Sequence, residues 1–102
     1  MQSNTEALAV FDGKSLSYTY DNGMSITNAF DGADRSTDMG GTTLVEVVTV
    51  MNVAPDTYYI VWEDAERGLS TQTVNFATKD VHTAITMDGN ITVMSGSVTD
   101  FS

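Results

Sequence analysis

Two tyrosines and an aspartate are the residues of this chain best suited to chemistry. Tyr18 and Tyr20 are two positions apart, as are Trp62 and Asp64, so each pair would share one face of an extended strand. In a dry interior the two hydroxyl groups could hold a carboxylate or a phenol. Loss of water raises the pKa of a carboxyl group, which favours general acid or base catalysis. Tyrosines also line packed β-cores that bind nothing, and this alternative stays open.

The same alternation extends the candidate site. Tyr58 shares the strand face of Trp62, and Asn28 interrupts an apolar row on the run that follows the two tyrosines. Proton transfer is assigned to Tyr18, Tyr20 and Asp64. Ligand contacts are assigned to Tyr18, Tyr20, Asn28, Tyr58, Trp62 and Asp64.

Other chemical motifs are weak. His82 is the only histidine, and one histidine cannot supply a metal triad, so we expect it at the surface or an interface. Asp31, Asp34 and Asp38 are spaced somewhat like calcium ligands, but no closing glutamate follows and a solvated loop is the better interpretation. There is no cysteine and no phosphate-binding glycine motif. We therefore expect neither a metal nor a cofactor.

The charge balance limits the classes of partner. Fourteen acidic residues face four basic ones, which gives a formal net charge of −10 at pH 7. Such a chain repels phosphate backbones and anionic lipid surfaces, so roles in nucleic-acid or membrane binding are disfavoured. No signal peptide or transmembrane segment is recognisable, and a cytoplasmic location is expected.

Short runs with a period of two, separated by Gly, Asn and Asp, predict an all-β chain. Seven strands are predicted, with an eighth over residues 7–11 if that run joins. The seven cover residues 14–20, 24–30, 44–51, 57–64, 69–77, 80–87 and 91–98. Sequential short strands favour one antiparallel up-and-down barrel, whose closure removes exposed edges. An open sandwich is the second choice.

The remaining segments are expected to be irregular. Residues 31–43 show no period and form the longest predicted loop, a candidate lid over a binding site. The polar N-terminal residues and residues 100–102 are expected to fray. No repeat or linker is visible, so residues 1–102 are interpreted as one domain with its core at about 13–98.

The stretch from Tyr18 to Gly23, Tyr-Thr-Tyr-Asp-Asn-Gly, resembles the first hairpin of the phenolic acid decarboxylases. Residues 59–62, Tyr-Ile-Val-Trp, with the run that ends Val-Asn-Phe at 74–76, are similar to that family's central hairpin and equally to the MoaF-like group of small calycin barrels. Residues 81–85 fit the next strand. The resemblance covers residues 13–87 and implies a lipocalin-like barrel of seven or eight strands with a ligand-sized interior.

In the decarboxylases a tyrosine pair, an arginine and a glutamate point into the barrel. The resemblance places Tyr18 and Tyr20 at the tyrosine pair and Asp64 at the glutamate. The matching stretch for the arginine, residues 40–43, reads Gly-Gly-Thr-Thr, so the arginine is missing unless Arg35 replaces it. This departure favours the MoaF-like assignment over decarboxylation.

Three functions follow from these observations. The first is a MoaF-like barrel that holds a small aromatic or carboxylate-bearing metabolite. The second is a cofactor-free lyase or isomerase that uses Tyr18, Tyr20 and Asp64. The third is a structural or interaction domain with a filled core. Because residues 44–51 and 59–62 are apolar on both faces, we also expect a homodimer.

Overall fold

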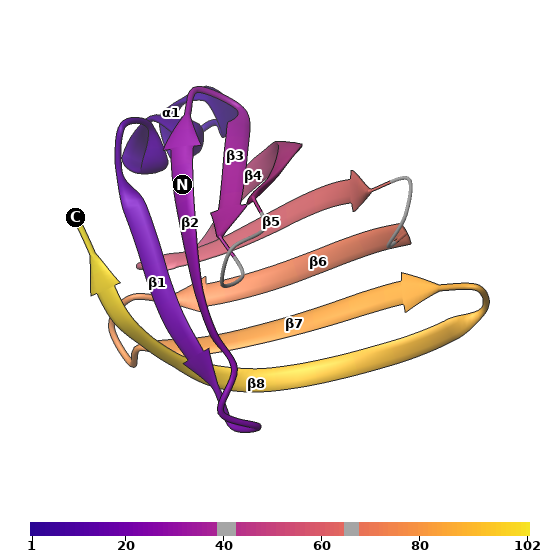
Figure 1. Ribbon diagram of the computed structural model, residues 1–102. Helices are drawn as coiled ribbons and strands as arrows, with labels where there is room; N and C mark the ends of the chain where they lie inside the picture. The colour runs from indigo at the N-terminus through magenta and orange to yellow at the C-terminus, as the bar shows by residue number, and fades with distance from the viewer. Residues whose placement is uncertain (39–42, 65–67) are drawn as a thin grey trace.

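The computed structural model describes residues 1–38, 43–64 and 68–102, apart from the side chain of Asp64. These residues form one short helix and eight strands (Figure 1). The elements are α1 (Asn4–Phe11), β1 (Ser15–Tyr20), β2 (Ser25–Asp31), β3 (Asp34–Asp38), β4 (Thr43–Ala54), β5 (Thr57–Asp64), β6 (Gly68–Asn75), β7 (Asp80–Met87) and β8 (Asn90–Phe101).

The eight described strands form a closed antiparallel barrel (Figure 1). Each strand pairs with the next one in the chain, and β8 pairs with β1 to close the barrel. At this seam a Cβ atom on Gly96 would overlap with the carbonyl oxygen of Thr19, so glycine allows β8 to approach β1 closely. The predicted up-and-down calycin-like barrel is confirmed.

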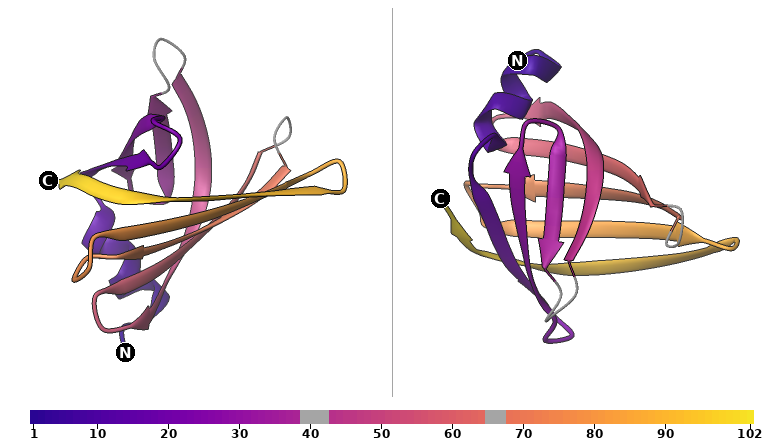
Figure 2. Two further views of the ribbon diagram at one scale, coloured as in Figure 1. Left: turned by 90° about the horizontal axis from the view of Figure 1, so that it is seen from below. Right: turned by 45° about the horizontal axis from the view of Figure 1, so that its top comes forward.

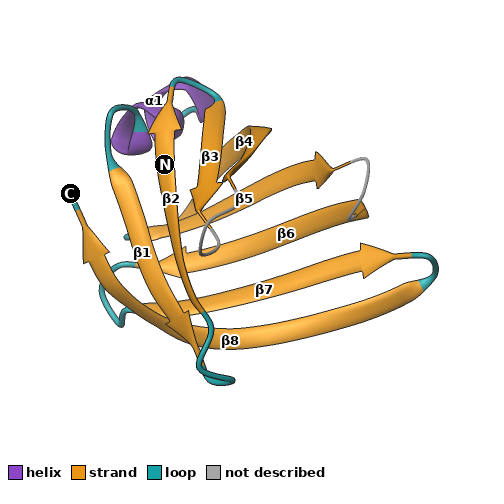
Figure 3. Cartoon of the chain, in the orientation of Figure 1, coloured by secondary structure: helices purple, strands orange, loops and turns teal. Residues whose placement is uncertain are grey.

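The prediction of a strand over residues 7–11 is wrong, because these residues belong to α1 (Figure 3). Ser3 Oγ accepts the backbone N–H of Glu6 at 3.2 Å, and Glu6 Oε1 accepts that of Ser3 at 3.0 Å. This capping box satisfies N–H groups that a helix start would leave unpaired.

Among the described residues, no helix is long and apolar enough to cross a membrane.

The helix α1 covers one end of the barrel (Figure 2). Aromatic side chains fill this end. Phe11, the last residue of α1, is fully buried. Its ring centroid lies 5.0 Å from that of Phe30, 5.3 Å from Tyr58, 5.9 Å from Phe76 and 5.5 Å from Phe101. We call these five residues the aromatic cluster. Large rings packed in this way contribute much of the apolar area that stabilises a small domain.

Both ends of the chain are held, and the prediction that they fray is wrong. Gln2 accepts a hydrogen bond from the Tyr58 hydroxyl at 3.0 Å and donates its backbone N–H to Asn52 at 3.2 Å. Ser102 exchanges two backbone hydrogen bonds with Ser15, at 2.9 and 3.0 Å. Phe101, just before it, packs in the aromatic cluster, which ties the C-terminus to the core.

The predicted loop over residues 31–43 is also wrong over its described part, because it contains β3. This strand pairs with β2 on one side and β4 on the other. Its inward positions are Arg35 and Thr37, both buried. Because these inward residues are polar, the strand has no apolar alternation to reveal it. Residues 39–42, part of the candidate lid, lie outside the described residues.

Candidate functional site

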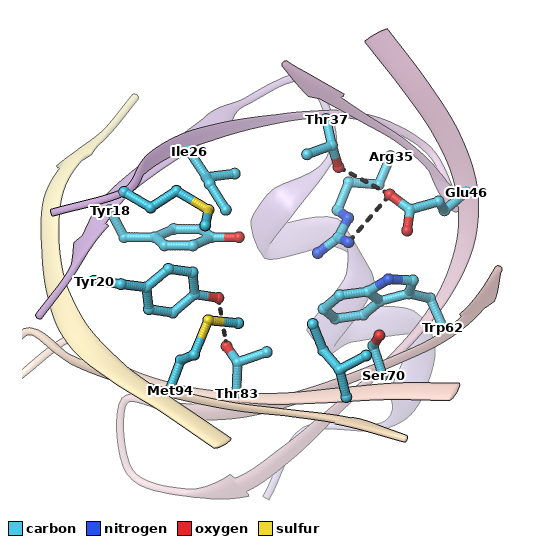
Figure 4. A pocket seen from close by; sticks show the side chains of 12 residues that line it. Tyr18, Tyr20, Ile26, Arg35, Thr37, Glu46, Trp62, Ser70, Thr83 and Met94 are labelled. Carbon is cyan, nitrogen blue, oxygen red and sulfur yellow. Dashed lines mark hydrogen bonds and ion pairs between the residues drawn. The ribbon is translucent and has the colours of Figure 1, made fainter. Parts of the chain in front are cut away.

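The half of the barrel away from α1 contains a cavity of about 130 Å³. Twelve side chains line it, contributed by all eight strands and by the β1–β2 turn (Figure 4). Nine of the twelve are buried. The three others are apolar: Met24 is exposed, while Ile85 and Met94 are half-buried. Apart from Ile26, the buried lining residues are therefore polar or aromatic, and the more exposed ones are apolar.

Tyr18 and Tyr20 form one wall of the cavity, as the sequence predicts (Figure 4). Their rings meet edge to face, with centroids 5.3 Å apart. Burial raises the pKa of Tyr18 well above its ordinary value, helped by the neighbouring Tyr20 and opposed by Arg35. Its hydroxyl therefore stays protonated at physiological pH and acts as a neutral hydrogen-bonding group.

An ion pair stacked on the tryptophan forms the opposite wall. Arg35 Nη2 lies 3.2 Å from Glu46 Oε1, and both side chains are buried. The Arg35 guanidinium also sits over the Trp62 ring, 3.6 Å from the ring centroid. A guanidinium held between a carboxylate and an indole face has a fixed position, because both neighbours restrain its plane.

A chain of hydrogen bonds joins the two walls through buried side chains. Tyr18 donates to Asn28 Oδ1 at 2.8 Å, and the Asn28 amide donates to Thr37 Oγ1 at 3.0 Å. Thr37 in turn donates to Glu46 Oε1 at 2.8 Å. Asn28, predicted as a ligand contact, does not line the cavity and instead accepts the hydrogen bond of the Tyr18 hydroxyl.

Some buried polar atoms of this region have no partner among the described residues. They are Nε and Nη1 of Arg35 and Oε1 of Gln72. A buried N–H or C=O group without a hydrogen bond costs about 1 to 3 kcal/mol, so native proteins rarely leave one unmatched without a functional reason. Because Arg35 lines the cavity, these N–H groups are donors available to a molecule bound there.

Residues 8–99 match the model of a protein family described as MoaF-like. The chain belongs to the MoaF-like family. The resemblance of its sequence to that group is thereby confirmed. No curated protein matches this MoaF-like chain.

Among solved structures, the MoaF-like chain is similar to a crystal structure from Burkholderia vietnamiensis described as that of a candidate beta-lactamase. The two share 28% sequence identity, with a TM-score of 0.78. The match covers 86% of this chain and 92% of the other. The two proteins therefore share the barrel over nearly its whole length.

Of the other candidate residues of the MoaF-like barrel, Tyr58 lies away from the cavity and His82 is at the surface, while the side chain of Asp64 is not described. Tyr58 lies in the aromatic cluster at the other end, with its hydroxyl bonded to Gln2, and does not line the cavity. Asp64 is the last residue of β5, and its side chain is outside the described part of the structure. His82 is exposed, as predicted, and lies 3.0 Å from the hydroxyl of Ser95.

The two charged residues among the described lining of the cavity are absent from the site predicted from the sequence. Arg35 is named only as a replacement for a missing arginine, and Glu46 is not predicted at all. Glu46 lies on the same face of β4 as the buried Val48 and Val50. An acidic residue within this apolar row is the sequence signal that could have identified it. Residues 40–42, where the resemblance looks for an arginine, lie outside the described residues.

Proposed function

We propose that this MoaF-like barrel binds a small organic molecule in the cavity, with a hydrogen-bond acceptor of the ligand against Arg35. The unpartnered N–H groups of Arg35, whose side chain is only 2% exposed, carry this proposal. A preformed cavity of about 130 Å³ supports it. Cavities of about 150 Å³ in other proteins hold benzene, so a single ring is a suitable size.

Trp62 provides the test, because it is the only tryptophan and it contacts Arg35. Titration with phenols and aromatic acids should change its fluorescence in a saturable way. The variant Tyr18→Phe/Tyr20→Phe keeps both rings and should weaken binding by about 1 to 3 kcal/mol in total. An unchanged emission across a broad panel would favour the third function, a structural domain with a filled core.

The enzyme alternative keeps one specific observation in its favour. The cavity holds two tyrosines, an arginine and a glutamate, the same set of four side chains that the phenolic acid decarboxylases place inside their barrel. Glu46 is the acid among the described lining residues, and Asp64 stays the acid predicted from the sequence. Release of carbon dioxide from a phenolic acid would support this alternative. Asp64→Asn and Glu46→Gln would then show which carboxyl group moves the proton, since only that variant should lose turnover.

The name of the structural neighbour suggests a further activity, β-lactam hydrolysis, which the geometry does not favour. Ser70 is the buried serine that lines the cavity. Among the described residues it has no hydrogen bond to a lysine or histidine, and a serine nucleophile needs such a base. We therefore place a binding function ahead of hydrolysis.

We further propose that the chain forms a homodimer through the outer face of β4. Val45 and Val47 on this face are 67% and 68% exposed. Contiguous exposed apolar side chains usually mark a contact surface. Sedimentation should show a dimer at high micromolar concentration and a monomer for Val45→Lys/Val47→Lys. A monomeric wild-type protein would contradict the dimer.

A further inference from the structure

The cavity has no net formal charge among its described lining residues. Arg35 and Glu46 are the charged side chains that line it, and they form an ion pair at 3.2 Å. A carboxylate that entered would add an unmatched negative charge close to Glu46, in a protein whose net charge is already −10. The ion pair therefore works against an anionic ligand.

The hydrogen-bonding groups of the cavity include both donors and acceptors. Arg35 offers Nε and Nη1 as donors. Both hydrogen bonds to Glu46 from described residues end on Oε1, which leaves Oε2 as an acceptor. A hydroxyl group suits this pair of neighbours, because it accepts one hydrogen bond and donates another. A carboxylate can only accept.

The mouth of the cavity favours an apolar body behind that hydroxyl. Met24 is 41% exposed, and Ile85 and Met94 are half-buried, whereas the polar lining residues are buried. Methionine side chains adapt to ligands of different shape. A ligand with its polar group at Arg35 would therefore leave its apolar part against these three residues.

We infer that the cavity takes a neutral amphipathic molecule with a phenol or alcohol group, the hydroxyl pointing inward between Arg35 and Glu46, and discriminates against carboxylates of the same size. This inference rests on the proposed function, and it names the ligand class of the same site. The ion pair acts as the specificity filter: Arg35 supplies the donor, and Glu46 cancels its charge and receives the ligand hydroxyl.

Benzyl alcohol and benzoate form a matched test pair, because they have one ring and one carbon at the polar group. Binding is measured at pH 7 by calorimetry and by Trp62 fluorescence. Wild-type protein should bind benzyl alcohol, and also phenol, about tenfold more tightly than benzoate, as expected when one unmatched charge opposes binding.

The variant Glu46→Gln removes one charge and keeps an oxygen that can accept from Arg35 and Thr37. It leaves the Arg35 charge unmatched, so benzoate should bind about tenfold more tightly than to wild type, and the preference for benzyl alcohol should be lost. Glu63→Gln is the control. Glu63 is an exposed acid of β5 that does not line the cavity, so its loss makes the same charge change elsewhere and should leave the preference as in wild type.

The outcomes separate the two proposals. Benzoate binding to wild type as tightly as benzyl alcohol or phenol would overturn the ligand class while leaving the binding function intact. If none of the three compounds nor any wider panel member binds, the binding function itself fails, and the ligand class fails with it. The wild-type comparison needs no variant, so it decides the question even if Glu46→Gln does not fold.

Discussion

The two ends of the barrel differ in the kind of side chain that they bury: aromatic rings at one end and polar groups at the other. At the α1 end, Phe11 is surrounded by aromatic rings, and the one hydroxyl group of that cluster, on Tyr58, is bonded to Gln2. At the cavity end, Arg35 is equally buried but keeps two nitrogens without a partner among the described residues. At one end the hydroxyl group has a partner, and at the other two buried nitrogens have none among the described residues.

From this difference we expect the aromatic end of the core to stabilise the fold and the cavity end to serve the proposed binding function. Burying large rings is favourable, whereas burying unmatched polar groups opposes folding. The aromatic end can therefore offset the cost of the cavity end. If so, substitutions at the aromatic end should change stability, and substitutions at the cavity should change binding and pH dependence.

The largest effect is expected for Phe11→Ala. The change removes the ring at the centre of the aromatic cluster and should lower the free energy of unfolding by about 3 to 5 kcal/mol. Urea denaturation measures the loss. Val93→Ala, at a side chain that is 75% exposed, is the control and should change stability by less than about 0.5 kcal/mol. Equal losses in the two variants would contradict the stabilising role of this end.

Next in size is the cost of breaking the cavity ion pair. Arg35→Met leaves the Glu46 charge buried without its partner and should lower the free energy of unfolding by about 3 kcal/mol. The double variant Arg35→Met/Glu46→Leu removes both charges and should recover most of this loss, with ligand binding still absent. A double variant no more stable than the single one would show that the pair, and not an isolated charge, governs stability.

A smaller effect is expected from the pH dependence of Tyr18. Burial raises its pKa in the folded protein above the ordinary value of 10.0. Above pH 10 the unfolded chain therefore holds fewer protons than the folded one, and stability falls as pH rises, by up to about 1.4 kcal/mol per pH unit for this group. Tyr18→Phe should make the fall between pH 10 and 12 shallower.

Denaturation at several alkaline pH values measures this slope. Tyr59→Phe, which removes a phenol from the outer face of β5, is the control for loss of a hydroxyl group. If Tyr18→Phe and wild type lost stability in parallel above pH 10, the hydroxyl of Tyr18 would not be shielded from water in the way that the cavity geometry requires.

The strands were predictable where one face is apolar, and the exceptions have physical causes. The strand β3 was not predicted because its inward residues, Arg35 and Thr37, are polar and line the cavity rather than the apolar core. The helix α1 was not predicted because it is short and has only two buried positions, although Ser3 and Glu6 match the capping-box pattern. Local function and short length both weaken the periodic signal on which such predictions depend.

Strand alternation assigned the correct face to the site residues but not their depth along the barrel. Tyr58 and Trp62 share a face of β5, yet they are four positions apart along the strand, about 13 Å, and Tyr58 lies in the aromatic cluster. Glu46 could have been identified from the sequence, because it is an acidic residue within an apolar row of β4. The pairing of Arg35 with Glu46 depends on the register of β3 and β4, which the sequence does not reveal.

Binding of a ligand to the unpartnered N–H groups of Arg35 can be observed directly by nitrogen-15 NMR of the arginine side chains. The sequence contains two arginines, Arg35 and Arg67, and an Arg35→Lys sample assigns their Nε–H signals. Addition of phenol or benzyl alcohol should shift the Arg35 signal in a saturable way and leave the Arg67 signal in place. A ligand that saturates the Trp62 fluorescence change while the Arg35 signal stays unmoved would contradict the account.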